Sequence, residues 1–211
     1  MMRLILIPAM ALLLAACQSA YYGAAEKVGY HKRDILVDRV EDSRDAQVDA
    51  EEQFQSALEQ LKALNNFDGG ELEDMYEKLA DEYEDSEEAA QEVRDRIDGV
   101  ENVAGALFKE WEQEIQEYSS ATLKADSQAK LRETRARYDA MIGALRKSEA
   151  KMDPVLAALK DNVMYLKHNL NARAVASLKV EFQSIEDDIG LLIAEMRKAI
   201  DSSDAFIASM Q

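Results

Sequence analysis

The sequence has few of the residues from which disulfide-bonded domains and metal centres are built. Only one of its 211 residues is cysteine, and two are histidine. A single cysteine cannot form a disulfide within the chain, so a disulfide framework is excluded. Proline and glycine, which most often interrupt helices, number only two and eight. Because strong helix formers such as Ala, Leu, Glu and Lys dominate the remainder, we predict long helices.

An apolar run near the N-terminus extends from Leu4 to Ala16. These thirteen residues are too few for a transmembrane helix, which needs about 20, but they suit the core of a signal peptide. The run ends in Leu14-Ala15-Ala16-Cys17, which resembles the lipobox of bacterial lipoproteins. We therefore predict that residues 1–16 are a lipoprotein signal peptide and that Cys17 is lipidated as the first residue of the mature chain.

The resemblance to bacterial lipoproteins also implies a location. The residue after Cys17 is Gln18, and in Gram-negative lipoproteins a residue other than Asp at this position usually implies sorting to the outer membrane. Each acyl methylene in the bilayer contributes about 0.8 kcal/mol, so several acyl chains form a firm anchor. We expect a protein held by its lipid on the periplasmic face of the outer membrane.

Acidic residues greatly outnumber basic ones, at 42 against 25. Removal of residues 1–16 takes away one base and no acid, which leaves 24 bases, 42 acids and a formal charge of −18. Nucleic acids are bound through Lys and Arg that neutralise phosphates. A surface with this charge repels such a partner, so we expect no nucleic-acid binding.

Three short breaks divide the mature chain into four long segments. They lie at 65–70, 119–122 and 168–171, where Asn, Asp, Gly and Ser gather. Apolar residues three and four positions apart follow the later segments, a pattern typical of a coiled-coil seam. The segments are nearly equal in length, which favours back-and-forth packing. We predict an all-α fold in which residues 17–211 form one antiparallel four-helix coiled-coil bundle.

Two features of the middle segments refine this prediction. Residues 71–117 contain 18 acids and 4 bases, whereas residues 121–173 contain 6 acids and 11 bases. Opposite charge favours packing of these two segments against each other, although a solvated acidic face is an equal alternative. The apolar stripe of the third segment keeps its phase across Pro154. One kinked helix is therefore expected, with a new helix capped by Asp153 as the alternative.

The residues that could support chemistry are poorly placed for it. In an up-down bundle His31 and His168 lie at opposite ends, about 50 Å apart, so they cannot share a site. An EF-hand loop with Gly99 as its glycine fails because Arg94 and Arg96 occupy its first two ligand positions. Signatures of a catalytic triad, a phosphate loop or a Cys-x-x-Cys motif are missing from the sequence. We predict no catalytic residues, no metal and no cofactor.

Two stretches carry a family resemblance: EKVGYHKRDILVDRV at 26–40 and YLKHNLNARAVASL at 165–178. They resemble a proteobacterial family of helical lipoproteins that is known only as a domain of unknown function. The similarity runs along the whole mature chain. It implies a periplasmic location and a coiled-coil build, and it implies no activity or site residues.

These observations favour a structural or adaptor protein that acts through coiled-coil contacts with a protein partner, and not an enzyme. The alternative is a binding module in which the bundle holds a small ligand or a divalent cation. A binding module would show polar groups converging inside the bundle. Tyrosines and Trp111 aside, the apolar stripes contain only Ser86 and Glu149 as polar positions.

The basic pair Lys32 and Arg33 is the candidate partner surface. It lies in the stretch 26–33, which has three bases and one acid in a strongly acidic chain. At helical rise the pair is more than a Debye length of about 8 Å from the bilayer, so a protein partner is favoured over direct lipid attraction. Pairing with helix neighbours such as Asp38 is the alternative use of these charges.

Overall fold

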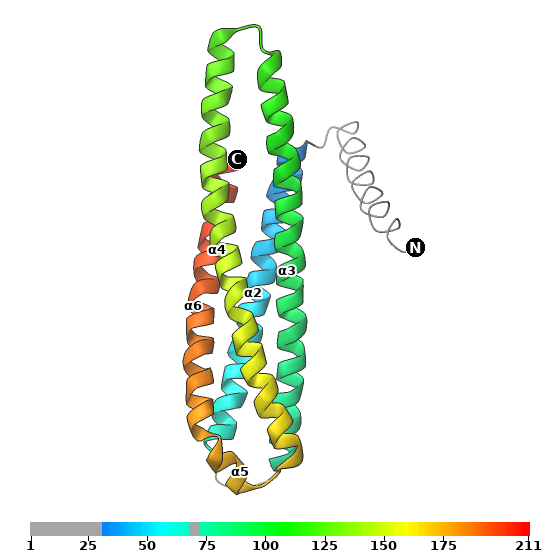
Figure 1. The fold of residues 1–211 in the computed structure, drawn as a ribbon, viewed down its shortest axis with the longest axis vertical. Helices are drawn as coiled ribbons and strands as arrows, with labels where there is room; N and C mark the ends of the chain where they lie inside the picture. The colour runs from blue at the N-terminus through cyan, green and yellow to red at the C-terminus, as the bar shows by residue number, and fades with distance from the viewer. Residues whose placement is uncertain (1–30, 68–71) are drawn as a thin grey trace, which may run out of the picture.

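A computed structural model describes residues 31–67 and 72–211 and contains five helices in this part of the chain (Figure 1). They are α2 (Lys32–Asn65), α3 (Leu72–Glu117), α4 (Ala121–His168), α5 (Ala172–Ser177) and α6 (Lys179–Met210). None of the residues in these two ranges forms a strand. The predicted all-α fold is confirmed, and each of the three predicted breaks falls between two helices.

The four long helices form an antiparallel bundle. Helix α2 packs against α3 and α6, and α4 packs against the same two helices from the other side. The order around the bundle is therefore α2, α3, α4, α6, with α2 and α4 on one diagonal (Figure 1). Short connections between consecutive helices produce this arrangement, because they leave each helix beside the one before it.

A continuous apolar core runs along the bundle and follows the predicted stripes. In α6 the positions Phe182, Ile185, Ile189, Leu192, Met196 and Ala199 are all buried. Phe54 of α2 and Phe206 of α6 are also among the largest fully buried side chains. Burial of such a side chain contributes about 1.5 to 3 kcal/mol, so the apolar stripes account for the assembly of the bundle.

In α4 the predicted stripe positions Leu145, Met152 and Leu159 are buried, but at other positions the buried residue is the one before the predicted one. Ser148 and Asn162 are buried, whereas their neighbours Glu149 and Val163 are only partly so. The Glu149 carboxylate instead lies at the edge of the core, where one oxygen is 2.9 Å from Arg146 Nη1 and the other 3.7 Å from Arg94 Nε. An ionised carboxylate is costly to bury, so the small hydroxyl of Ser148 occupies the inward position in its place.

A polar contact crosses the centre of the core. Gln47 of α2 and Ser148 of α4 are fully buried, and Gln47 Nε2 donates to Ser148 Oγ over 2.9 Å. Ser148 Oγ also donates to the backbone carbonyl of Leu145 over 2.8 Å. This contact joins the two helices on the diagonal. Because a buried polar group needs its partner, the contact disfavours sliding of α2 along α4.

The charge asymmetry between α3 and α4 appears as ion pairs between these helices. Arg146 lies 2.5 Å from an Asp98 oxygen and 2.6 Å from a Glu101 oxygen, and Arg135 lies 2.8 Å from Glu112. Exposed pairs contribute only about 0 to 1 kcal/mol each. Their main effect is on the choice of neighbour and on register, as expected from the opposite charge of the two segments.

The last predicted helix is divided in two, which corrects the expectation of one continuous segment. Helix α5 ends at Ser177 and α6 starts at Lys179, with Leu178 at the junction. Asn171 caps α5 by accepting from the Ala174 amide over 3.0 Å. Ser177 Oγ donates to the Ala174 carbonyl over 2.7 Å and competes with the backbone bonds that would continue the helix.

Pro154 lies inside α4, which confirms one helix in place of two. In Figure 1 the lower, yellow half of α4 runs obliquely to its upper half. Proline removes one backbone hydrogen bond and crowds the carbonyl four residues earlier, which explains a bend here. Asp153 does not cap a new helix, because its carboxylate pairs with Arg94 of α3.

Replacement of Pro154 by Ala should raise the free energy of unfolding by about 1 to 3 kcal/mol. The change restores a backbone hydrogen bond at an exposed position, so no core contact is lost. Thermal melts followed by circular dichroism measure the effect. A lower melting temperature would mean that the bundle requires the bend.

Candidate functional site

The four long helices differ in length, and the difference opens one end of the bundle. Helices α3 and α4 have 46 and 48 residues, whereas α2 and α6 have 34 and 32. The excess of 12 to 16 residues corresponds to about 18 to 24 Å of helix. All four helices end together at the end that carries α5, so at the other end the α3–α4 hairpin extends beyond the rest of residues 31–67 and 72–211 (Figure 1). We call residues 111–130 the hairpin overhang.

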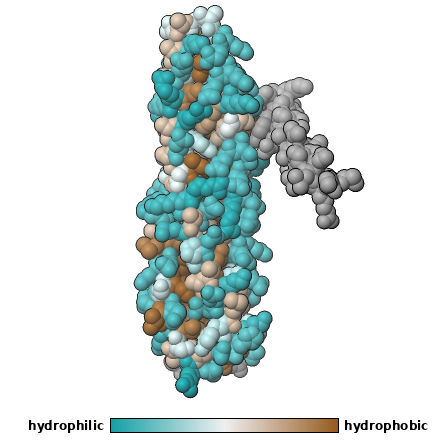
Figure 2. Space-filling view, viewed as in Figure 1, coloured by the Kyte–Doolittle hydropathy of each residue, from teal (hydrophilic) through white to brown (hydrophobic). Residues whose placement is uncertain are grey.

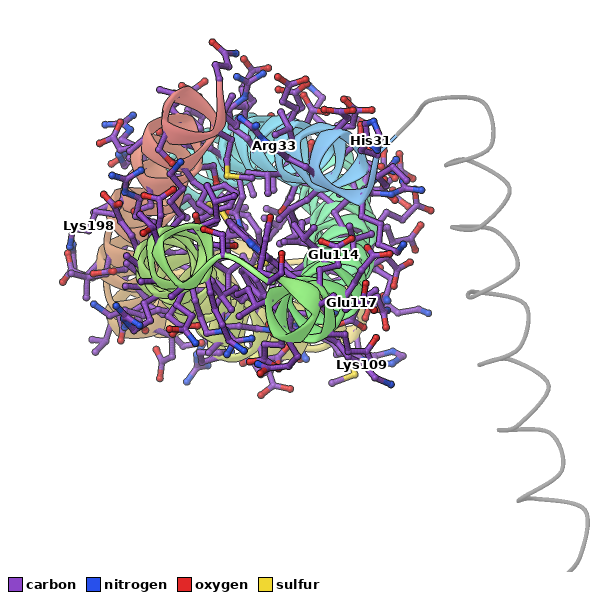
Figure 3. The ribbon with its side chains drawn as sticks, turned by 90° about the horizontal axis from the view of Figure 1, so that it is seen from above. His31, Arg33, Lys109, Glu114, Glu117 and Lys198 are labelled. Atoms are coloured by element: carbon purple, nitrogen blue, oxygen red, sulfur yellow. The ribbon has the colours of Figure 1, made fainter. Side chains whose placement is uncertain are left out.

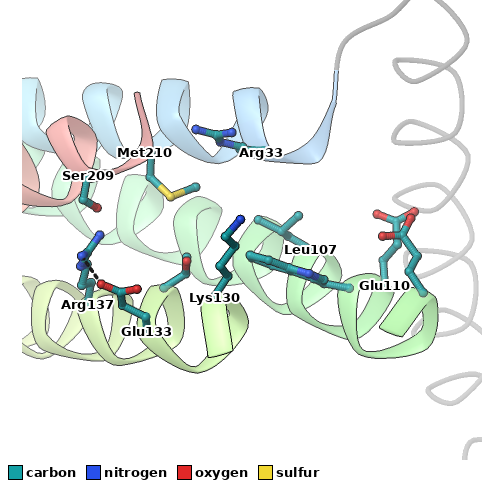
Figure 4. Close-up of a pocket in the computed structure, with 11 residues that line it drawn as sticks. Arg33, Leu107, Glu110, Lys130, Glu133, Arg137, Ser209 and Met210 are labelled. Atoms are coloured by element: carbon teal, nitrogen blue, oxygen red, sulfur yellow. Dashed lines mark hydrogen bonds and ion pairs between the residues drawn. The ribbon is translucent and has the colours of Figure 1, made fainter. Parts of the chain in front are cut away.

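A cleft of about 490 Å³ lies at the base of the hairpin overhang. Its apolar lining comes from Leu107 and Trp111 of α3 and Met210 of α6. Arg33 from the first turn of α2 and Glu114 from the overhang contribute charged groups. Figure 4 shows Arg33 and Met210 on one side of this cleft and the side chains of α4 on the other. All four long helices therefore contribute to one hollow.

Positive and negative groups are balanced around the cleft. The bases are Arg33, Lys130 and Arg137, and the acids are Glu110, Glu114 and Glu133. Most of these groups have partners, since Arg137 pairs with Glu133, Lys130 Nζ lies 3.0 Å from Asp126, and Glu110 pairs with Lys32.

Arg33 and Glu114 are the exceptions among the charged groups of the cleft. The side chain of neither residue forms a hydrogen bond or ion pair with any residue in 31–67 or 72–211. Figure 3 looks along the bundle onto this end and shows both residues there. The cleft thus presents one unpaired cation and one unpaired anion beside an apolar floor.

Aromatic contacts hold the base of the cleft. Trp111 Nε1 donates to Ser127 Oγ over 2.8 Å and ties the two helices of the overhang together. One turn further into the bundle, the ring of Tyr138 makes edge contacts with Phe108 at 5.4 Å and Phe206 at 6.4 Å. These contacts join α3, α4 and α6, so the cleft stands on a packed layer.

Tyr138 is the residue near the cleft with the largest change in acidity. Its burial, together with the nearby carboxylates of Glu101 and Asp139, raises the pKa of its hydroxyl to about 12. Burial disfavours the charged phenolate, and negative neighbours add to this effect. The side chain therefore stays neutral and acts as a packing group at ordinary pH.

Comparison with known protein families places the chain. Residues 21–210 match the family described as "Protein of unknown function (DUF2959)". The chain belongs to this family. The match confirms the resemblance to a helical family of unknown function, and the family description states no activity. No curated protein and no solved structure matches the chain.

The residues singled out from the sequence of this DUF2959 member have different surroundings. Cys17 lies outside the described residues. Lys32 Nζ lies 2.9 Å from Glu110 Oε2, and its side chain is 11% exposed, so its charge is used between α2 and α3. Arg33 is exposed and lines the cleft. The basic pair thus divides into one residue packed within the bundle and one at the site.

Sequence reasoning missed the cleft itself. The four segments look nearly equal in length because the first was counted from Cys17, whereas α2 begins at Lys32. The apolar stripe of the second segment predicts Trp111 in the core, whereas the structure places it half-buried at the edge of the cleft.

No group of three His, Cys, Asp or Glu side chains in residues 31–67 and 72–211 is arranged to hold a metal ion. No helix there is both long and apolar enough to cross a membrane.

The raised pKa of Tyr138 leads us to expect that the stability of the bundle depends on pH. Between pH 10 and 12 an unfolded chain loses this phenolic proton, whose ordinary pKa is about 10, while the folded chain keeps it. The contribution of the neutral Tyr138 side chain to the free energy of unfolding is therefore present below pH 10 and is lost as the pH rises toward 12. Tyr138→Phe should reduce the loss of unfolding free energy over this interval, as measured by urea denaturation.

Tyr118→Phe is the matched control, because it removes a phenol that is 43% exposed at the end of the hairpin. Equal pH profiles for wild type and Tyr138→Phe would show that the Tyr138 pKa is not raised.

Proposed function

We propose that this protein is a lipid-anchored adaptor on the periplasmic face of the outer membrane and that it binds a protein partner in the cleft. It has no catalytic role in this proposal. The lipobox ending at Cys17 and the following Gln18 support the anchor and its location. The cleft at the open end of the bundle supports the docking role.

Cys17 lies close in sequence to the open end of the bundle, which supports an orientation in which this end faces the membrane. Lys32, the first residue of α2, follows Cys17 by fifteen residues and lies at the open end beside Glu110. Fifteen residues reach at most about 50 Å when fully extended. The far end of α2 lies a further 34 residues along the helix, or about 51 Å away. The open end is therefore the part of the bundle that a lipid on Cys17 holds closest.

The observation that carries the docking proposal is the combination of Trp111, Met210 and an unpaired Arg33 in one hollow. Trp, Met and Arg are enriched in the centres of protein interfaces. The unpaired Arg33 and Glu114 can each meet an opposite charge on a partner, which favours one orientation of docking.

A small-ligand site is the second candidate for the same cleft. Its volume of about 490 Å³ lies in the range of ligand pockets, and charges of both signs line it. A ligand would raise the melting temperature of the purified protein without any crosslinked protein at the cleft. This outcome separates the two candidates.

The anchor is tested by Cys17→Ser. Membrane attachment depends on the lipid, whereas folding depends on the apolar core of the bundle. The variant should therefore be lost from the outer-membrane fraction, while its helical circular dichroism stays unchanged. Fractionation at high salt, followed by detergent-phase partitioning, measures attachment. A variant that still fractionates with the outer membrane would show that the lipid is not the main anchor.

Docking is tested by a photo-crosslinking residue at position 130 of the full-length protein in cells. Lys130 is exposed and lines the cleft, and Ala194 in the middle of α6 is an exposed control position away from both ends. We expect crosslinked protein from position 130 and none from position 194.

Lys32→Glu and Arg33→Glu form a matched pair for the same assay. Both changes place a carboxylate in the first turn of α2, so both gain the same favourable helix-dipole interaction. Lys32→Glu also replaces the ion pair with Glu110 by two carboxylates that repel each other, so it should lower the melting temperature. Arg33→Glu should leave stability within about 0.5 kcal/mol and abolish the crosslinks. Crosslinks that persist in a stable Arg33→Glu variant would contradict docking through Arg33.

A further inference from the structure

The end of the bundle away from the cleft exposes apolar and basic side chains together. Its members lie in the last turns of α4 and in the connection through α5, and we call them the α5 corner: Met164, Tyr165, Lys167, Leu170 and Arg173. The three apolar members are 38 to 50% exposed. Figure 2 shows that brown, hydrophobic patches alternate with hydrophilic surface over the lower half of the bundle. An exposed cluster of this kind is a common feature of interaction sites.

The α5 corner lies in the longest stretch without an acid among residues 31–67 and 72–211. Residues 162–180 contain no Asp or Glu, although the whole chain has 42. Lys167 and Arg173 form no ion pair with the rest of residues 31–67 and 72–211. Elsewhere in the bundle Arg146 and Arg197 both pair with carboxylates of a neighbouring helix. The corner therefore offers unused positive charge beside exposed apolar groups.

Helix α3 carries the complementary surface at the same end. Its first turns contain a set of exposed acids that make no ion pair within the two described ranges, and we call them the acidic run: Glu73, Asp74, Glu77, Asp81, Glu84, Asp85 and Glu88. The two surfaces lie at the same height, because Lys160 of α4 lies beside Tyr83 of α3. Since α3 and α4 are neighbours, both surfaces belong to adjacent sides of one bundle.

We propose that the α5 corner binds the acidic run of a second copy of this chain. In a two-fold dimer with its axis along the bundle, the corner of each copy meets the acidic run of the other, so one interface forms both contacts. A two-fold axis parallel to the bundle places the two copies at the same height. The corner of one copy can therefore meet the acidic run of the other only if both surfaces lie at equal height, as they do here. The apolar members lose solvent contact, and the charges supply complementarity and orientation.

This dimer is compatible with the lipid anchor, although it does not depend on it. Bundles related by an axis parallel to their length point the same way, so both open ends face one membrane. The interface lies at the opposite end from Arg33 and Glu114 and leaves both clefts accessible. Failure of the dimer would therefore leave the proposed docking role untouched, and failure of the docking role would leave the dimer untouched.

The test uses purified full-length protein in detergent and reads its mass by sedimentation at a series of concentrations. Two variants reverse one surface each: Lys167→Glu with Arg173→Glu, and Glu77→Lys with Glu84→Lys. We expect a dimer for the wild type and at least a tenfold weaker association for each variant alone. An equimolar mixture of the two variants should restore the dimer, because each reversed surface then meets its complement.

Circular dichroism melts of each variant show that it is folded, and all four positions are exposed. Reversal of Lys109 with Arg132, which are exposed, make no ion pair within the described residues and lie away from the α5 end, is the control for a change in net charge. A monomeric wild type, or a mixture that stays monomeric while both variants are folded, would overturn the proposal.

Discussion

The apolar stripe of each long helix must be covered by neighbouring helices along its whole length. At one end of the bundle, α2 and α6 are too short to cover the stripes of α3 and α4. Along most of the bundle, four helices cover one another's stripes. Beyond Lys32 of α2 and Met210 of α6, α3 and α4 are the only helices among the described residues that continue. There the stripe of α3 meets a single helix, so Trp111 is covered on one side by Ser127 and faces the cleft on the other. The candidate site is therefore a direct consequence of where two helices end.

Charged residues are arranged differently at the two ends and in the middle of the bundle. In the middle, arginines such as Arg146 join neighbouring helices and select the antiparallel order. At the open end, Arg33 and Glu114 stay unpaired, and at the other end so do the bases of the α5 corner. Because an exposed charge gains little from a surface pair, unpaired charge is not a cost to the fold. It is available for recognition at both ends.

Much of the fold could be predicted from the sequence, because helix breaks and apolar periodicity are local signals. The turns near Asn66, Ser119 and Asn169 and the continuous passage through Pro154 are of this kind. The local shift from Glu149 to Ser148 in the α4 core could not be predicted, since it depends on the ion pair between Glu149 and Arg94 of α3. The division at Leu178 could not be predicted either, because the apolar residues keep their spacing of three and four positions across it. The cleft depends on the mutual register of four helices, which no single segment encodes.

The central claim is that the open end of the bundle is its working surface. Hydrogen–deuterium exchange, compared between the protein in isolated outer membranes and the purified protein in detergent, tests this claim without knowledge of the partner. We predict slower exchange in membranes for peptides that contain residues 107–114 and 130–137, which line the cleft. The middle of α2 should exchange equally in both samples. Equal exchange at the cleft, with protection confined to other surfaces, would contradict the account.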